Sequence, residues 1–136
     1  MRLALDTNRY VDFCRGDELA VQRVQEAERI YLSFVSLAEL RAGFLCGTKA
    51  RQNERGLTRF LNSPRARILY PDDQTAHHYA RLFQQLRDQA TPIPTNDIWI
   101  AAVTAREGAV VLTYDAHFAG IARVSSRVLE LPARPL

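Results

Sequence analysis

Lysine is almost absent from this chain. Lys49 is the only lysine among 136 residues, whereas arginine occurs 17 times. Cysteine is scarce too, and Cys14 and Cys46 form neither a CxxC pair nor a zinc-ligand pattern with a nearby histidine. Both are therefore expected to be buried free thiols of a reducing compartment. The N-terminal apolar run stops at Asp6, too short for a signal peptide or a membrane span, so we expect a soluble cytoplasmic protein.

Two further absences restrict the chemistry. The chain has no glycine-rich phosphate loop, and no serine, cysteine or lysine stands beside a base that would make it a covalent nucleophile. Arginine's planar fork suits phosphate contacts, although a GC-biased genome would produce the same arginine excess. Arg51, Arg55 and Arg59 recur every four residues, which predicts a basic stripe on one helix face. The stripe fits a solvated surface, contact with RNA or contact with a protein partner.

The hydrophobic pattern alternates short apolar runs with amphipathic segments of helical period. Strands are expected at 2–5, 30–35, 66–70, 109–113 and 128–131. Helices are expected at 7–15, after a cap at Asp17, from Ser36 to Gly47, within 48–62, from Asp72 or Asp73 to about 89, and at 96–107. Strands separated by helices indicate parallel βαβ units. We predict a single α/β domain over residues 1–136, with a central parallel sheet flanked by helices.

Four carboxylates stand where a strand should end or a helix should begin: Asp6, Glu39, Asp97 and Asp115. The carboxyl ends of parallel strands lie along one edge of a sheet, where ligands bind. Four acids at that edge would repel one another unless a divalent cation lay between them. Oxygen ligands select hard cations, so the expected ion is Mg²⁺ or Mn²⁺. Such sites activate a water molecule to hydrolyse phosphodiesters, which makes metal-assisted hydrolysis the best-matched reaction.

The acids also have simpler interpretations as helix caps. Asp6 can cap the helix that begins at Thr7, and Asp115 can cap a short turn. Glu39 follows Ser36 by three residues, and this capping-box spacing would explain Glu39 without any ligand role. Asp97 has the best functional case, because a charged residue at the mouth of a buried helix needs a partner beyond the cap.

Three polar residues accompany the acids. Thr7 and Asn8 open the first helix, where their backbone N–H groups and side chains could hold a phosphate. Thr113 leaves the sheet edge beside Asp115 and could orient a water or a phosphate. Thr95 or Asn96 is expected to cap the helix that carries Asp97, which follows Pro94.

Five other conspicuous residues have ordinary explanations. His77 and His78 are expected on the surface of a long helix rather than at a metal. His117 most simply stabilises a turn. Trp99 and Phe118 are expected in the core or at an oligomer interface.

Four segments taken together resemble the PIN-domain ribonucleases, and specifically the VapC toxins of bacterial toxin–antitoxin pairs. They are Leu-Asp-Thr-Asn at 5–8, and residues 36–43, 96–102 and 112–118. The resemblance implies a site of Asp6, Glu39, Asp97 and Asp115 assisted by Thr113. It also implies Mg²⁺ or Mn²⁺, RNA cleavage, a homodimer and a VapB-like antitoxin. Tyr114 stands where a smaller polar or basic residue is expected, which affects substrate preference rather than catalysis.

Three alternatives compete with this resemblance. A receiver-type signalling domain needs a lysine at the end of its last strand, but Lys49 lies elsewhere. A haloacid-dehalogenase-type phosphatase needs an aspartate two residues after the first one, where this chain has Asn8. A PIN nuclease of RNA processing without an antitoxin stays open, and a neighbouring antitoxin gene would decide.

Overall fold

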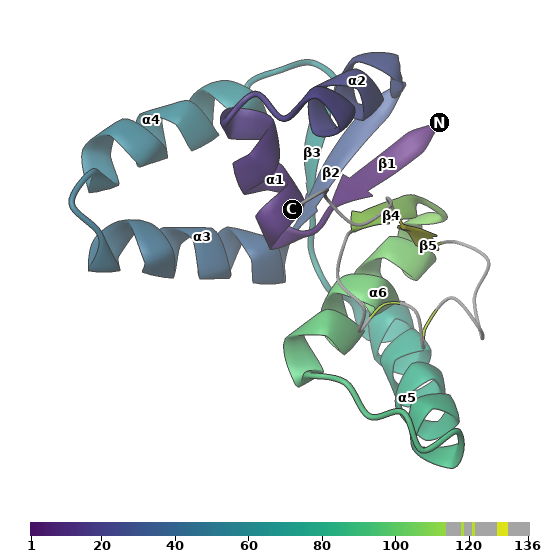
Figure 1. Cartoon of the computed structure of the whole chain (residues 1–136). Coiled ribbons are helices and arrows are strands. Elements are labelled where there is room, and N and C mark those ends of the chain that lie inside the picture. The colour runs from purple at the N-terminus through teal and green to yellow at the C-terminus, as the bar shows by residue number, and fades with distance from the viewer. Residues whose placement is uncertain (114–117, 119–120, 122–127, 131–136) are drawn as a thin grey trace.

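A parallel sheet organises the chain, as seen in the computed structural model of Figure 1. The structure describes residues 1–113, 118, 121 and 128–130. Within these residues, five strands form the sheet: β1 (Arg2–Leu5), β2 (Arg29–Ser33), β3 (Ala66–Leu69), β4 (Val110–Thr113) and β5 (Val128–Glu130). Their order is β3-β2-β1-β4-β5, and every neighbouring pair is parallel. The predicted α/β fold with a central parallel sheet is confirmed.

The strand order reverses direction between β1 and β4. From β1 the chain adds β2 and then β3 on one side, whereas β4 and β5 lie on the other. Such a switch point leaves a crevice at the carboxyl ends of the two central strands, where open α/β sheets bind ligands. Asp6 follows β1 directly and Thr113 ends β4, so both lie at the switch point.

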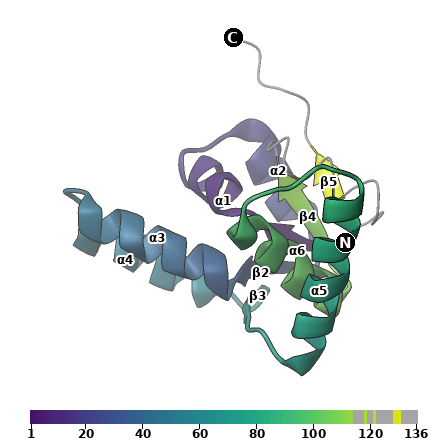
Figure 2. The ribbon, with the colours of Figure 1, turned by 90° about the horizontal axis from the view of Figure 1, so that it is seen from below.

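Helices cover both faces of the sheet (Figures 1 and 2). They are α1 (Thr7–Cys14), α2 (Glu18–Glu26), α3 (Phe34–Cys46), α4 (Ala50–Leu61), α5 (Asp73–Asp88) and α6 (Thr95–Glu107). Alternate strand residues serve the two faces, as the period of two requires. Leu3 and Leu5 pack into a cluster with residues of α1 to α4, whereas Ala4 packs with Val103 of α6 on the other face.

Helices α3 and α4 form a hairpin that projects from the sheet (Figures 1 and 2). The two helices contact each other and are tied by Arg41, whose Nε donates to Glu54 at 2.8 Å. Leu57 is fully buried and anchors α4 to the hydrophobic cluster that contains Leu3 and Leu5. Leu45, near the end of α3, is 80% exposed, so the far end of the hairpin lies outside the core.

The boundary between β2 and α3 differs from the prediction. The strand ends at Ser33 rather than at residue 35, and α3 begins at Phe34 rather than at Ser36. The side chain of Ser33 accepts the backbone N–H of Ser36 at 2.9 Å, so Ser33 is the N-cap. The apolar residues Phe34 and Val35 extend the strand-like pattern in the sequence, but this cap starts the helix before them.

Other boundaries differ less. Strand β3 ends at Leu69 instead of residue 70, and α6 begins at Thr95 instead of residue 96. The expected caps Asp17 and Asp72 are confirmed, since each accepts a backbone N–H at the start of its helix. Residue 131, at the expected end of the last strand, lies outside the described residues.

The cysteine prediction was wrong in one respect. Cys14 and Cys46 are free, as expected, but both are exposed rather than buried. Each is the last residue of its helix, α1 or α3, where the chain leaves the core. In the part of the chain that the structure describes, no helix combines the length and apolarity needed to cross a membrane.

Candidate functional site

A cavity of about 400 Å³ lies at the sheet's switch point. The described residues that line it come from the start of α1, from α3, and from the α5–α6 loop with the first turns of α6: Asp6, Thr7, Asn8, Glu39, Pro94, Thr95, Asn96, Asp97 and Ile100. Three of the four predicted acids are therefore brought together. No arginine, lysine or histidine is among these described lining residues. The cavity wall thus offers oxygen donors with a net negative charge.

Asp6 both caps a helix and faces the cavity. Its Oδ1 accepts the backbone N–H of Arg9 at 2.7 Å, so the expected capping role is present. The side chain is buried, with 5% of the residue exposed. The two oxygens of a carboxylate provide about four acceptor positions, so a cap bond and a metal contact can coexist. The helix terminus also favours the ionised form. Capping and a ligand role are compatible at this residue.

Glu39 does not form the expected capping box with Ser36. Because α3 begins two residues earlier than predicted, Glu39 lies in its second turn rather than at the third helical position. Its Oε1 instead accepts the hydroxyl of Thr7 at 2.7 Å. The contact joins two segments that are 32 positions apart in sequence and holds Glu39 at the rim of the cavity.

Asp97 lies in the first turn of α6. The expected side-chain cap from Thr95 or Asn96 is absent, because the helix already includes both residues and its N-cap is Pro94. The proline carbonyl accepts the Asp97 N–H at 3.1 Å. The helix beyond is buried nearly all round, with Ile98 and Ile100 each at most 3% exposed. Asp97 is half-buried at its mouth, and its charge faces the positive end of the helix dipole.

Of the remaining predicted site residues, one is buried in the sheet and the other lies outside the residues that the structure describes. Thr113 is fully buried at the end of β4 and is not among the residues that line the cavity. Asp115 belongs to residues 114–117, which lie outside the described part of the chain, as do Tyr114 and His117.

The donor set fits a hard divalent cation. Every acidic side chain at the cavity offers oxygen, and Mg²⁺ prefers oxygen ligands and keeps several of its waters. Among the described residues, no three acidic, histidine or cysteine side chains are grouped closely enough to hold an ion by themselves. A space of about 400 Å³ bordered by three acids accommodates an ion that keeps part of its water shell. The fit therefore rests on the chemistry and placement of the donors.

A larger cavity, of about 970 Å³, lies between α1 and α4 and was not anticipated from the sequence. It contains the edge-to-face contacts of Phe60 with Tyr10 and Phe13, at centroid distances of 5.2 and 5.8 Å. Burial, with a contribution from Cys14, raises the pKa of the Tyr10 phenol. In the sequence, this cavity is marked only by the aromatic residues Tyr10, Phe13 and Phe60, and the same three residues would suit an ordinary hydrophobic core.

The basic stripe on α4 is divided by this cavity. Arg55 and Arg59 line it, whereas Arg51 does not, and all three arginines are exposed. None of the three lines the acidic cavity. The three alternatives for the stripe, which are contact with RNA, contact with a protein and exposure to solvent, all stay predictions.

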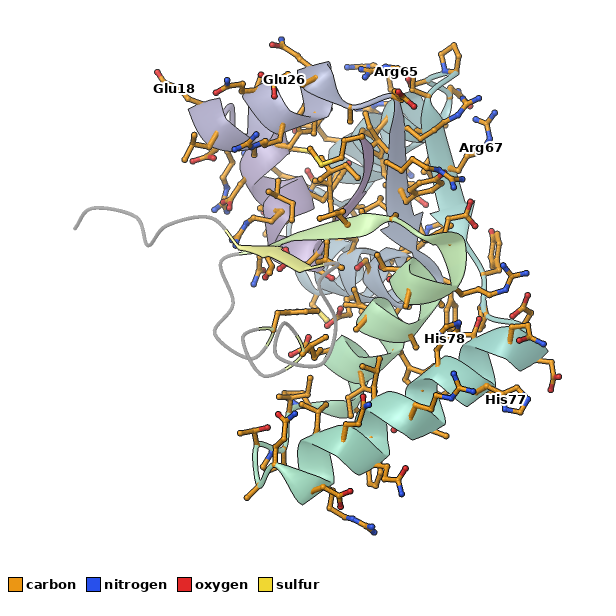
Figure 3. The ribbon with its side chains drawn as sticks, turned by 90° about the vertical axis from the view of Figure 1, so that its right-hand side faces the viewer. Glu18, Glu26, Arg65, Arg67, His77 and His78 are labelled. Atoms are coloured by element: carbon orange, nitrogen blue, oxygen red, sulfur yellow. The ribbon has the colours of Figure 1, made fainter. Side chains whose placement is uncertain are left out.

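The ordinary explanations of the other conspicuous residues mostly hold. His77 is exposed on α5 and His78 is partly exposed on the same helix (Figure 3). Trp99 is partly buried and stacks on Tyr79 of α5, with ring centroids 4.1 Å apart. Phe118 is 1% exposed and belongs to the core.

Comparisons with known proteins agree with this arrangement. The PIN domain family profile matches residues 3–124. Ribonuclease VapC1 of Haemophilus influenzae is 30% identical over 115 residues, covering 82% of this chain and 84% of that protein. Ribonuclease VapC5 of Mycobacterium tuberculosis is 31% identical over 117 residues, covering 86% and 85%. The solved structure of VapBC-1 from nontypeable Haemophilus influenzae has a TM-score of 0.80 and 27% identity, covering 96% of this chain and 98% of that one.

Proposed function

Because this chain belongs to the PIN domain family, we propose that it is a metal-dependent endoribonuclease and the toxin of a toxin–antitoxin pair. One observation carries the chemistry: three carboxylates from three separate elements border one cavity at the switch point of a parallel sheet. The similarity to two ribonucleases over more than four fifths of the chain supports RNA as the substrate.

The residues that would hold Mg²⁺ or Mn²⁺ are Asp6, Glu39, Asp97 and Asp115. A bound ion would lower the pKa of a water and stabilise charge on the phosphate and the leaving oxygen. Asp6 caps α1 and Asp97 lies in the first turn of α6, so both carboxylates are held at helix N-termini that border the cavity. Thr113, fully buried at the end of β4, is assigned the supporting role beside Asp115.

Substrate contacts are assigned to the start of α1. Thr7 and Asn8 occupy the first two helical positions and line the cavity, so their backbone N–H groups point toward a phosphate held there. The exposed side chain of Asn8 supplies a further donor. The hydroxyl proton of Thr7 is already given to Glu39, which leaves its amide for the substrate.

The partners follow from the same proposal. A similar solved structure is that of VapBC-1, which supports a small VapB-like antitoxin as the protein partner here. We further propose a homodimer and a cytoplasmic location, where RNA substrates are found. Co-purification with the product of a neighbouring small gene would support the antitoxin. Light scattering that finds only a monomer at high concentration would remove the dimer and leave the chemistry untouched.

Incubation of the purified protein with structured RNA tests the activity. Cleavage is expected with Mg²⁺, and its loss is expected with EDTA and in Asp97→Asn. A matched control is Asp88→Asn, which changes an exposed acid at the end of α5 outside the cavity. Cleavage that persisted in EDTA or in Asp97→Asn would refute the mechanism.

A further inference from the structure

Three hydroxyl groups and one carboxylate lie in a row beneath the rim of the acidic cavity. Ser33 Oγ is 3.2 Å from Ser36 Oγ, which is 3.0 Å from Thr7 Oγ1. Thr7 Oγ1 is in turn 2.7 Å from Glu39 Oε1. The row joins the start of α1 to the start of α3, and it ends on a residue that lines the cavity.

The direction of the protons in this row follows from what each group can do. A carboxylate only accepts, so the proton between Thr7 and Glu39 belongs to Thr7. A hydroxyl has a single proton, so the proton between Ser36 and Thr7 comes from Ser36. Ser33 then donates to Ser36 while it accepts the Ser36 backbone N–H as helix cap. Every hydroxyl donates once, and the row runs toward the charge, an arrangement in which each bond strengthens the next.

The two serines are buried, and their neighbours along the chain are mostly apolar. Ser33 is 2% exposed and Ser36 is fully buried. Their neighbours in the chain include Leu32, Val35 and Leu37, all of them core residues. Burying a hydroxyl without a partner costs free energy, and the helix cap accounts for Ser33 alone. Ser36 contributes no cap, so its hydroxyl has the link between Ser33 and Thr7 as its evident purpose.

We propose that Thr7 and Ser36 are positioning residues, which fix the carboxylate of Glu39 at the edge of the acidic cavity. This inference rests on the proposed function, because it gives Glu39 a task there. Glu39 is exposed and has three rotatable side-chain bonds, so without Thr7 its carboxylate would sample many positions. A hydroxyl held from behind by Ser36 restricts that freedom before any ion arrives.

The test compares variants that differ by one hydroxyl. Thr7→Val keeps the shape and removes the donor, whereas Thr7→Ser keeps the donor and removes a methyl group. Ser36→Ala removes only the support behind Thr7. Thr104→Val is the matched control, since its buried hydroxyl donates to Ile100 O within α6 and takes no part in the row. Thermal unfolding of each variant confirms that it is folded before binding is measured.

The first readout is the affinity for Mn²⁺, measured by calorimetry in the absence of RNA. Loss of a group that orients a metal ligand costs about tenfold in affinity, which is the effect expected for Thr7→Val. Thr7→Ser and Thr104→Val should bind like the parent, and Ser36→Ala should fall between the parent and Thr7→Val. Parent-like affinity in Thr7→Val, when Glu39→Gln binds more weakly, would overturn the inference.

The second readout needs no metal. In the ion-free protein, NMR relaxation of the Thr7 methyl group should show greater mobility in Ser36→Ala than in the parent. An unchanged Thr7 methyl would overturn the role of Ser36. A parent protein that binds no Mn²⁺ and cleaves no RNA would refute the proposed function, and the positioning role with it. That result is distinct from failure of the positioning alone, in which the parent binds and cleaves and Thr7→Val does so equally.

Discussion

The two ends of the sheet use charge in opposite ways. At the amino end, Arg2 donates to the Tyr31 hydroxyl at 2.7 and 3.0 Å and to Glu107 at 2.6 Å, which ties β1 to β2 and to the end of α6. Hydrogen bonding to Tyr31, with charge from Glu107, raises the pKa of the Arg2 guanidinium. At the carboxyl end, Asp6, Glu39 and Asp97 border a cavity to which no described residue brings a basic side chain.

A second arginine repeats the pattern at the amino end. Arg65, just before β3, donates to the carbonyls of Val24 and Ala27 at 3.0 and 2.6 Å, and so satisfies the end of α2. Figure 3 shows Arg65 at the same end of the molecule as Glu26 on that helix. Arginines at this end complete the backbone and ion-pair network, whereas acids at the other end gather around a space. Stability and the proposed catalysis are thus assigned to opposite ends of the strands in one sheet.

The largest expected effect comes from Asp6→Asn, which tests whether the cavity acids serve chemistry rather than folding. Asparagine caps helices about as well as aspartate, so the free energy of unfolding should change little. RNA cleavage should fall by about a thousandfold, because a metal ligand supports several kcal/mol of transition-state stabilisation. Gel-based cleavage assays and chemical denaturation measure the two quantities on the same sample.

A stable variant that still cleaved RNA would make Asp6 a cap and nothing more. Unfolding of Asp6→Asn would instead place the acid among the folding residues, and the contrast between the two ends of the sheet would fail. Asp12 offers a matched acid on the same helix, since it pairs with Arg9 at 2.7 Å and does not line the cavity. Asp12→Asn should therefore lower stability more than Asp6→Asn does.

The sequence predicted the positions of the acids better than their contacts. Carboxyl ends of parallel strands must share one edge, so alternating strands and helices sufficed to bring Asp6 and Asp97 together. The bond from Thr7 to Glu39 could not be predicted, because no spacing rule links residues 32 positions apart. The misplaced start of α3 hid it further, since a capping box with Ser36 already explained Glu39.

The unpredicted parts of the fold have equally local causes. Phe34 and Val35 continue the apolar run of β2, but the Ser33 side chain accepts the Ser36 N–H as a helix cap, so both residues belong to α3. The cavity between α1 and α4 is lined by residues of α1, α2, β2, α3 and α4. Packing of this kind involves contacts between distant segments, which periodicity along one segment does not report.

Tyr31→Phe tests the amino end and should give the next largest effect. The change removes the acceptor of two bonds from the exposed guanidinium of Arg2 and so loosens the tie between β1 and β2. The free energy of unfolding should fall, as measured by urea denaturation. Cleavage of RNA by the folded variant should equal that of the parent. A loss of cleavage at unchanged stability would reverse the assignment of the two ends.

Addition of Mn²⁺ to the ion-free protein tests whether the carboxyl end of the sheet binds an ion that stabilises the folded chain. An ion that binds only the folded chain stabilises it, by about 1.4 kcal/mol at a concentration roughly ten times its Kd. The midpoint of thermal unfolding should therefore rise in the parent and return on addition of EDTA. The same rise is expected in Tyr31→Phe but not in a variant that combines Asp6→Asn with Asp97→Asn. An equal rise in that double variant would mean that the ion binds elsewhere.

The smallest expected effect concerns Asp72, which follows β3. Like the residues at the amino end of the sheet, it is held by a hydrogen bond and an ion pair rather than bordering the cavity. It accepts the Thr75 backbone N–H at 3.0 Å and pairs with Arg106 at 3.2 Å. The Thr75 hydrogen bonds and the Arg106 charge lower the pKa of Asp72 below 3.8. A lowered pKa in the folded state means stability that is present above pH 3.8 and lost as pH falls through the folded value.

Asp72→Asn keeps a capping side chain and removes the charge, so it isolates this dependence. Urea denaturation of parent and variant should show a modest stability gap at neutral pH that closes as the solution is acidified through the Asp72 pKa, in a range where the parent stays folded. The matched control is Asp73→Asn at the exposed next position, which removes one negative charge from the start of α5 and leaves the Asp72 cap in place. A gap at Asp72 that held constant with pH would mean that the charge contributes nothing and that the cap alone stabilises α5.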